Sequence, residues 1–201
     1  MTKIKCCGLS RMCDIEAANH LMPEYIGFVF APKSRRYVSA DKARALKQAL
    51  SPEIKAVGVF VNETPEQIAT LTDKGIIDMI QLHGNEDEAY IEKLRALTDK
   101  PIIKAFRIET VADVEKAVQS TADAILLDSG AGTGKVFNWK LLADIKRPYF
   151  LAGGLAPNNI KQALQQLTPD AVDVSSGIET DGDKDKEKMA AFIAAVRKED
   201  Q

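Results

Sequence analysis

Two side chains of this sequence are suited to proton transfer: the thiol of Cys7 and the carboxyl of Asp128. Each stands at the end of an apolar run typical of a buried strand, residues 3–7 and residues 124–128. A thiol can act as a base or a nucleophile when its pKa falls from about 8.5 toward neutrality. A partly buried carboxyl can hold a proton near neutral pH and act as an acid, a base or a metal ligand. A buried structural cysteine and a carboxylate that caps the following loop are the alternatives.

Further polar side chains follow other apolar runs. His83 is interpreted as a polar contact at the mouth of the site, or as a structural hydrogen-bonding group. Arg36 lies in a short basic segment, where a guanidinium can bind a carboxylate through two hydrogen bonds. Its neighbours Lys33 and Arg35 are interpreted as solvated surface charge. The two histidines of the chain have no metal-ligand spacing with each other or with nearby acids, so no metal site is expected.

Two clusters of small residues in the last quarter of the chain could bind a phosphate. Glycine lets the backbone approach an anion closely, and the N–H groups of a turn can converge on it. Ordinary tight turns are the alternative for either cluster alone, but two clusters in adjacent loops favour an anion site. The residues expected to bind the phosphate are Gly153 and Gly154 in the first cluster, and Ser175, Ser176 and Gly177 in the second.

A third glycine-rich run, residues 129–134, directly follows Asp128. It lacks the spacing of a nucleotide-binding Walker loop, and no Ser or Thr follows Lys135, the lysine directly after the run, so a nucleotide-hydrolysing site is not expected. The run is interpreted as a flexible flap over the site.

The candidate residues are separated by a regular alternation of strands and helices. Apolar runs rich in β-branched residues predict eight strands, at 3–7, 25–30, 55–61, 77–82, 101–106, 123–128, 148–152 and 171–174. Amphipathic stretches predict eight helices, at 12–21, 40–50, 65–74, 86–97, 110–120, 139–145, 157–167 and 184–198. Strict alternation implies parallel strands with helical crossovers, and this length fits a closed (β/α)8 TIM barrel of the α/β class, a single domain over residues 1–201. The polar segment before the last helix is expected to be a loop.

The barrel also predicts where each side chain points, because residues two apart on a strand face the same side. In the first strand Lys5 and Cys7 belong inside, with the charged group near a solvent-filled end, while Ile4 and Cys6 face the helices. The same rule directs His83 and Asp128 into the mouth. The phosphate clusters follow the seventh and eighth strands, where barrels of this type commonly bind phosphate.

Composition limits the remaining classes of function. A formal net charge of −2 and no lysine- or arginine-rich cluster interleaved with aromatic residues argue against nucleic-acid binding, so a small-molecule substrate is expected. No apolar run reaches the roughly 20 residues that span a bilayer, and the N-terminus leads directly into a strand, which makes a cytoplasmic location the default expectation. Three cysteines within the first 13 residues are expected to be reduced thiols.

The motifs, taken in order, resemble the phosphoribosylanthranilate isomerase family. The resemblance runs from about Lys3 to the final helix and is carried by residues 5–9, 27–37, 59–62, 81–84, 126–128 and 173–177. It implies an isomerase of tryptophan biosynthesis that converts N-(5-phosphoribosyl)anthranilate to 1-(2-carboxyphenylamino)-1-deoxyribulose 5-phosphate by an Amadori rearrangement. It implies no cofactor and no obligate protein partner. Cys6 departs from the family, which usually has an aliphatic residue there.

The resemblance further implies a role for each candidate. Asp128 would be the general acid that protonates the furanose ring oxygen, and Cys7 would be the base that removes the proton from C2′. A thiolate of low pKa opposite a carboxyl of high pKa would supply both groups at one pH. Arg36 would steer the anthranilate carboxylate, Asp173 would contact the sugar hydroxyls, and the two small-residue clusters would hold the phosphate.

Two alternatives remain at this stage. One is a different phosphosugar isomerase, although a sister tryptophan-pathway barrel would be expected to have a lysine and a glutamate in place of Cys7 and Asp128. A related aminoaldose substrate of the histidine pathway carries two phosphates and would favour a second anion site. The other alternative is a barrel that binds a phosphosugar without catalysis, since a fold alone proves no activity.

Overall fold

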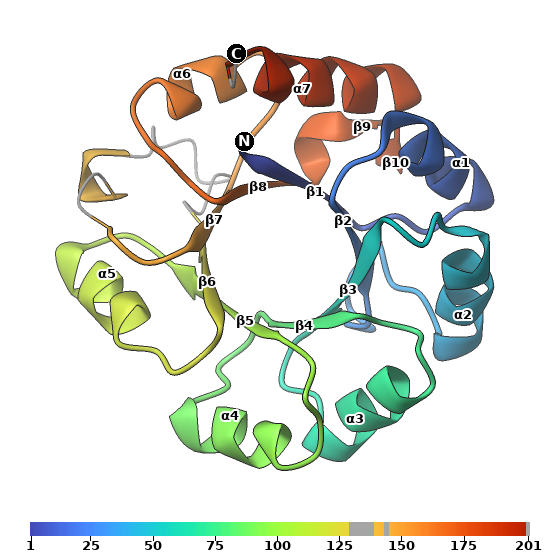
Figure 1. The fold of residues 1–201 in the computed structure, drawn as a ribbon, viewed down its shortest axis with the longest axis vertical. Helices are drawn as coiled ribbons and strands as arrows, with labels where there is room; N and C mark the ends of the chain where they lie inside the picture. The colour runs from blue at the N-terminus through green and yellow to red at the C-terminus, as the bar shows by residue number, and fades with distance from the viewer. Residues whose placement is uncertain (129–138, 143–144, 200–201) are drawn as a thin grey trace.

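A computed structural model describes residues 1–128, 139–142 and 145–199 of the chain. Eight parallel strands form a closed barrel in sequence order, and helices surround it (Figure 1). The predicted (β/α)8 barrel is therefore confirmed. The barrel strands are β1 (Lys3–Cys7), β2 (Tyr25–Val29), β3 (Lys55–Phe60), β4 (Met79–Leu82), β5 (Ile102–Arg107), β6 (Ala124–Asp128), β7 (Tyr149–Ala152) and β8 (Ala171–Val174).

The helices lie on the outside of the barrel, and most match the predicted ranges. They are α1 (Met12–Leu21), α2 (Ala40–Ala49), α3 (Pro65–Asp73), α4 (Glu88–Arg95), α5 (Val111–Val118), α6 (Ile160–Leu164) and α7 (Lys186–Glu199). The helix predicted at 139–145 is instead a short 3-10 helix, η1 (Trp139–Leu142), and residues 143–144 lie outside the described part. The helix predicted at 157–167 is shorter than expected, because the chain turns through Pro157–Asn159 before α6 begins.

The side chains of each strand alternate between two apolar layers. The outer layer, between strands and helices, contains Ile4 and Cys6 of β1. The inner layer fills the barrel with residues such as Val57, Leu126 and Phe150. The two layers together confirm the period-two assignment made from the sequence.

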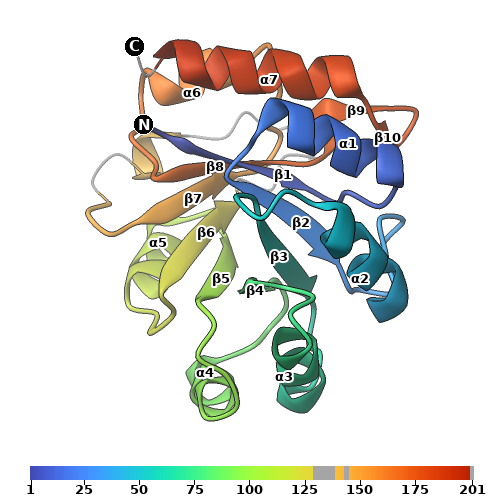
Figure 2. The same ribbon diagram turned by 45° about the vertical axis from the view of Figure 1, so that its right-hand side comes forward.

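The barrel closes between its first and last strands, where β1 pairs with β8 in parallel and Lys5 lies beside Asp173. The last helix reinforces this seam. Arg197 of α7 donates a hydrogen bond to the Thr2 carbonyl and another to Glu24, whose carboxylate also accepts from the Ile4 N–H. Figure 2 shows α7 crossing above β8 and β1. The two ends of the sequence therefore meet along one edge of the barrel.

The polar segment before α7 is an ordered hairpin, which corrects the expectation of a loop. Strands β9 (Glu179–Thr180) and β10 (Asp183–Lys184) pair in antiparallel, and both intervening residues, Asp181 and Gly182, have positive φ. That geometry is typical of a two-residue Asp-Gly turn. The hairpin follows a short 3-10 helix, η2 (Ser176–Ile178), and lies beside α1 (Figures 1 and 2).

None of the helices in the described residues is long and apolar enough to cross a membrane.

Candidate active site

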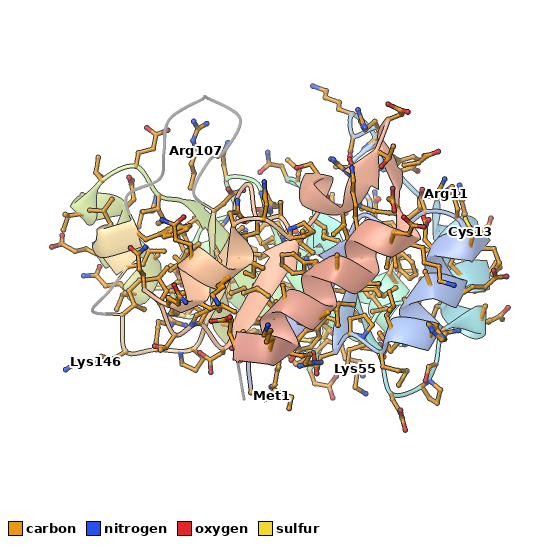
Figure 3. The ribbon with its side chains drawn as sticks, turned by 90° about the horizontal axis from the view of Figure 1, so that it is seen from above. Met1, Arg11, Cys13, Lys55, Arg107 and Lys146 are labelled. Carbon is orange, nitrogen blue, oxygen red and sulfur yellow. The ribbon has the colours of Figure 1, made fainter. Side chains whose placement is uncertain are left out.

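The carboxyl ends of the strands surround a cavity of about 330 Å³. Figure 3 shows the barrel from its side, with Arg107 at the end of β5 on the opposite side of the molecule from Met1 and Lys55. The cavity brings together every predicted site residue except Gly177. Its lining includes Cys7, Arg36, His83, Asp128, Gly153, Gly154, Asp173, Ser175 and Ser176. The glycine-rich run 129–134, which was interpreted as a flap, lies outside the described residues.

Cys7 points into the cavity and Cys6 points away from it. Cys7 packs with Val29 and Val59 inside the barrel, close to the mouth. Cys6 belongs to the layer between barrel and helices, and burial raises its pKa to about 12. The structure therefore presents only one of the two adjacent thiols to the cavity.

A buried ion pair lies next to Cys7. The Lys5 ammonium is fully buried and donates to both carboxylate oxygens of Asp173, each at 3.0 Å. Burial alone would lower the pKa of Lys5, but the Asp173 carboxylate raises it above its ordinary value. Lys5 was expected near a solvent-filled end of the barrel, and this is wrong, because its side chain is fully buried. The burial is possible because Asp173, its ion-pair partner, lies beside it on β8. Lys5 is a fixed positive charge inside the barrel.

The expected low pKa of Cys7 is not what this environment produces. Burial raises the pKa of the Cys7 thiol, while the nearby Lys5 ammonium opposes that rise. A buried thiolate is costly because it loses its hydration, and a single cation offsets only part of that cost. The structure thus holds Cys7 mainly as a thiol at neutral pH, with Lys5 as the group that favours its ionised form.

Asp128 and His83 approach each other across the mouth. The His83 Nε2 atom lies 3.8 Å from Asp128 Oδ2, and both side chains are about one-third exposed. On its other side, His83 Nδ1 lies 2.9 Å from Gln81 Nε2. Burial lowers the pKa of His83, with Asp128 opposing. If the Gln81 amide donates to Nδ1, the neutral ring carries its proton on Nε2, facing Asp128.

The same pair also borders a second hollow. A larger cavity of about 920 Å³ extends over the ends of β4 and β5 and shares His83 and Asp128 with the first. Its charged side chains have both signs, including Glu86, Lys104 and Arg107. Glu86 and Lys104 form a buried ion pair at 3.0 Å. Asp128 therefore stands where two hollows meet.

The loops after β7 and β8 have the geometry of a close backbone cradle. Gly153 and Gly154 both have positive φ, at 95° and 61°, which L side chains rarely adopt. The Asn159 side chain fixes this loop, since it donates to the Gly154 carbonyl and accepts from the Ala156 N–H. Ser175 and Ser176 begin the short 3-10 turn after β8. Both loops line the cavity.

Gly177 packs the two loops together. A Cβ atom added there would lie 1.9 Å from the Leu155 carbonyl oxygen, far inside contact distance. Gly177 was predicted to bind phosphate, yet it is absent from the cavity lining in the described residues. The phosphate contact of Gly177 stays a prediction. In the structure, the missing side chain of Gly177 lets the loop after β8 approach the loop after β7.

We therefore expect Gly177→Ala to separate the two loops. The clash should destabilise the protein by about 1–3 kcal/mol and raise KM for a phosphorylated substrate. Gly75→Ala is the matched control. A side chain at Gly75 strains the backbone, because its φ is 64°, but nothing lies within 4 Å of the added Cβ. This control therefore destabilises the protein without pushing two loops apart. Urea unfolding and steady-state kinetics check both variants. An unchanged KM in Gly177→Ala, or an equal rise in Gly75→Ala, would contradict this reading.

Arg36 lines the cavity, but the carboxylate that it binds through two hydrogen bonds in this structure belongs to Glu179 of the protein itself. The Arg36 Nε and Nη2 atoms donate to the two oxygens of Glu179 at 2.6 and 2.8 Å. This side-on pair occupies one edge of the guanidinium and leaves the Nη1–Nη2 edge for a second carboxylate. The stem of Arg36 passes over Gly8, where an added Cβ would lie 2.5 Å from Arg36 Cδ. Sequence reasoning missed Glu179.

Among the described residues, no three His, Cys, Asp or Glu side chains come together as potential metal ligands.

Comparison with known proteins shows the family of this chain. A family model of N-(5'-phosphoribosyl)anthranilate (PRA) isomerase matches residues 4–195. The chain belongs to the PRA isomerase family. PRA isomerase of Clostridium acetobutylicum is 46% identical over 98% of this chain and 99% of its own length. That of Acetivibrio thermocellus is also 46% identical, over 100% of this chain and 98% of its own length.

Solved PRA isomerase structures have the same fold. The crystal structure from Thermotoga maritima has a TM-score of 0.90 at 35% identity and covers 98% of this chain and 100% of that one. A second PRA isomerase structure, in complex with reduced 1-(o-carboxyphenylamino)-1-deoxyribulose 5-phosphate, has a TM-score of 0.87 at 35% identity, with the same coverage. Family membership makes the chain an isomerase of tryptophan biosynthesis.

Proposed function

We propose that the cavity at the carboxyl ends of the strands carries out the PRA isomerase reaction by acid–base catalysis, with Asp128 as the acid and Cys7 as the base. The observation that carries this proposal is that Cys7 and Asp128, from β1 and β6, line one cavity together with two glycine- and serine-rich loops. A related PRA isomerase binds a reduced carboxyphenylamino-deoxyribulose phosphate, and the cavity here offers groups for each part of such a ligand.

The first step opens the ribose ring. The Asp128 carboxyl gives its proton to the furanose oxygen, the bond from C1′ to that oxygen breaks, and the anthranilate nitrogen lone pair forms a C1′=N bond. His83 Nε2, 3.8 Å from Asp128, is placed to support the carboxylate that remains. Asp128 is about one-third exposed, so it can reach a substrate in the cavity and regain a proton from water.

The second step moves the double bond. Cys7 in its thiolate form removes the proton from C2′, the electron pair forms C1′=C2′, and the C1′=N electrons return to nitrogen. The resulting enolamine loses its O–H proton and gains one at C1′ to give the ketone. Carbon C1′ is reduced and C2′ is oxidised within one molecule, so no external electron carrier enters the reaction. The reaction needs a reduced Cys7, which fits the cytoplasm.

The ends of the substrate are held by groups of opposite charge or by backbone. The free edge of Arg36 binds the anthranilate carboxylate, and the loops with Gly153, Gly154, Ser175 and Ser176 bind the phosphate. Sugar hydroxyls lie between them. Gln81 supports this placement, since its Oε1 atom is buried beside the cavity and no hydrogen-bond partner for it exists among the described residues. A ligand hydroxyl would supply that partner. Asp173 keeps its proposed sugar contact in addition to its pair with Lys5.

The experiment that tests this function uses PRA made in situ from anthranilate and phosphoribosyl pyrophosphate. The purified protein, without added metal or cofactor, should consume PRA rapidly, as followed by fluorescence. Turnover should depend on both Cys7 and Asp128. Binding of the product without turnover would favour a phosphosugar-binding barrel instead.

The raised pKa of Cys7 leads to a prediction about pH. A base works when deprotonated, so the thiolate fraction, and with it the thiolate-dependent rate, rises as pH rises toward the Cys7 pKa. Lys5 lowers this pKa and Asp173 raises it, with Lys5 having the larger effect. The double variant Lys5→Met/Asp173→Asn removes both charges at once and should move the Cys7 titration to higher pH. The double change avoids leaving a buried carboxylate without its cation.

The measurement is the pH dependence of thiolate absorbance in a Cys6→Ala/Cys13→Ala background. That background removes two of the three cysteines of the chain and leaves the Cys7 thiol to be followed alone. The matched control is Lys47→Met/Asp78→Asn, an ion pair outside the cavity. A shift of the Cys7 titration to lower pH, or an equal shift in the control, would contradict the assigned effect of Lys5.

A further inference from the structure

The carboxylate of Glu179 connects the two ends of the cavity. Its Oε1 atom accepts from Arg36 Nε and from Lys184 Nζ, each at 2.6 Å, and its Oε2 atom accepts from Arg36 Nη2. The side chain is only 6% exposed. Burial would raise the pKa of Glu179, but the hydrogen bonds from Arg36 and Lys184 lower it. Arg35 Nη2 also lies 3.6 Å from Oε2, so Glu179 is an ionised carboxylate among three cations.

Lys184 extends the connection from Glu179 to the loop after β8, which contains Ser175. Its side chain is 2% exposed, and Nζ donates to the Ser175 carbonyl at 2.8 Å and to the Ser175 hydroxyl at 3.3 Å. The Ser175 hydroxyl in turn donates to the Cys7 carbonyl at 3.2 Å. The ammonium is thus directed at protein acceptors. It fixes the loop rather than reaching into the cavity.

The hairpin that carries both residues is itself held in place. Gly182 at its turn lies against Arg35, where an added Cβ would be 1.8 Å from Arg35 Nη2. Arg11, next to α1, donates to the Lys184 carbonyl at 2.6 Å and pairs with Asp183 at 2.8 Å. A short, anchored hairpin transmits position better than a free loop does, since it has few ways to move.

We propose that Glu179 and Lys184 are positioning residues that hold the free edge of Arg36 and the Ser175 loop at a fixed separation. The site then selects ligands whose carboxylate and phosphate are spaced to fit both ends at once. This inference rests on the proposed function, which takes Arg36 and the Ser175 loop as the two anion-binding ends. A fixed separation increases the affinity for a ligand that carries both groups. Once its carboxylate binds Arg36, its phosphate is already close to the Ser175 loop and binds there at a high effective concentration.

The test compares a two-ended ligand with its halves. In Glu179→Gln, the affinity for the product, 1-(2-carboxyphenylamino)-1-deoxyribulose 5-phosphate, should fall at least about tenfold as the two ends lose their fixed separation. The affinities for anthranilate and for ribose 5-phosphate should stay the same or increase, because a negative charge beside three cations, Arg35, Arg36 and Lys184, has been removed. Calorimetric titration measures all three ligands. Lys188→Met is the matched control, since Lys188 Nζ donates to the backbone carbonyl of Glu179, at 2.7 Å, rather than to its carboxylate.

A fall in the affinity for the product, without a fall in the affinities for anthranilate and ribose 5-phosphate, distinguishes a positioning role from other roles of Glu179. If Glu179 acted only by its charge, all three ligands would bind Glu179→Gln more tightly, and if it only stabilised the fold, all three would bind more weakly. Either result overturns the inference, as does an unchanged product affinity. Should Glu179→Gln not fold, Lys184→Met gives the second test, in which the product loses affinity while anthranilate does not. If the unmodified protein turns over PRA but Glu179→Gln does not show this pattern of affinities, only the inference is refuted. If the unmodified protein binds neither anthranilate nor ribose 5-phosphate, the proposed function is refuted as well.

Discussion

Replacing Asp128 with asparagine should lower kcat for PRA at least about a hundredfold, the usual contribution of a positioned acid, and change KM by only a few-fold. The amide keeps the size and most of the polarity of the side chain but has no proton to give to the ring oxygen. Because the acid acts in ring opening, the loss belongs to kcat. Steady-state fluorescence kinetics on the purified variant measures both constants.

Asp123→Asn is the matched control for this change. Asp123 precedes the same strand, β6, at the end of the barrel away from the cavity, where its carboxylate accepts from the Ile102 N–H. The variant should keep kcat within about twofold, since it touches neither substrate nor the proposed acid. Full activity of Asp128→Asn would remove Asp128 as the acid, and an equal loss in both variants would point to a defect in folding.

Replacing Cys7 with serine should also lower kcat at least about a hundredfold, because a hydroxyl is far less acidic than a thiol and provides almost no anionic base near neutral pH. The exchange of one atom leaves the cavity nearly unchanged, so KM should move little. Cys6→Ala is the matched control. Its side chain faces the helix layer and is expected to be almost silent in the same assay.

A loss in Cys6→Ala equal to that in Cys7→Ser would overturn the assignment of the two thiols by strand phase. The expected contrast is unusually sharp, because the two cysteines are neighbours in sequence and differ only in the side of the barrel that they face. Circular dichroism of both variants would show whether either change disturbs the fold.

Much of the site followed from the sequence because strand phase and barrel order are local signals. Each candidate closes an apolar run, and a parallel barrel gathers those ends at one mouth. The sequence alone therefore predicts that Cys7, Asp128 and His83 lie at one cavity. Their roles in the reaction remain predictions until the variants are measured.

What the sequence did not reveal depends on contacts between distant segments. The Lys5–Asp173 pair requires barrel closure and a register between the first and last strands, although closure itself was predicted. Glu179 and Lys184 lie in a segment read as a polar loop. The Asp-Gly dipeptide at 181–182 was the available signal for a hairpin. No pattern in the sequence indicated that Arg36 would meet Glu179.

The pKa of Cys7 could not be judged from the sequence for a different reason. The expectation of an acidic thiol came with the base role that the family resemblance implies for Cys7, but the depth of burial shifts the pKa of this thiol and is a property of the whole fold. Burial and the Lys5 charge act in opposite directions, so their difference is visible only in three dimensions.

The seam between β1 and β8 has a consequence for how the enzyme is made. Lys5 and Asp173 are 168 residues apart, so during synthesis the lysine leaves the ribosome long before its counter-ion exists. Cys7 and Ser175, which share a hydrogen bond across the same seam, are separated by the same span. Non-local contacts of this kind form late in folding because a long loop must be closed first. Cys7, the proposed base, therefore acquires its surroundings only when the barrel closes, and we expect the return of activity during refolding to report that closing step.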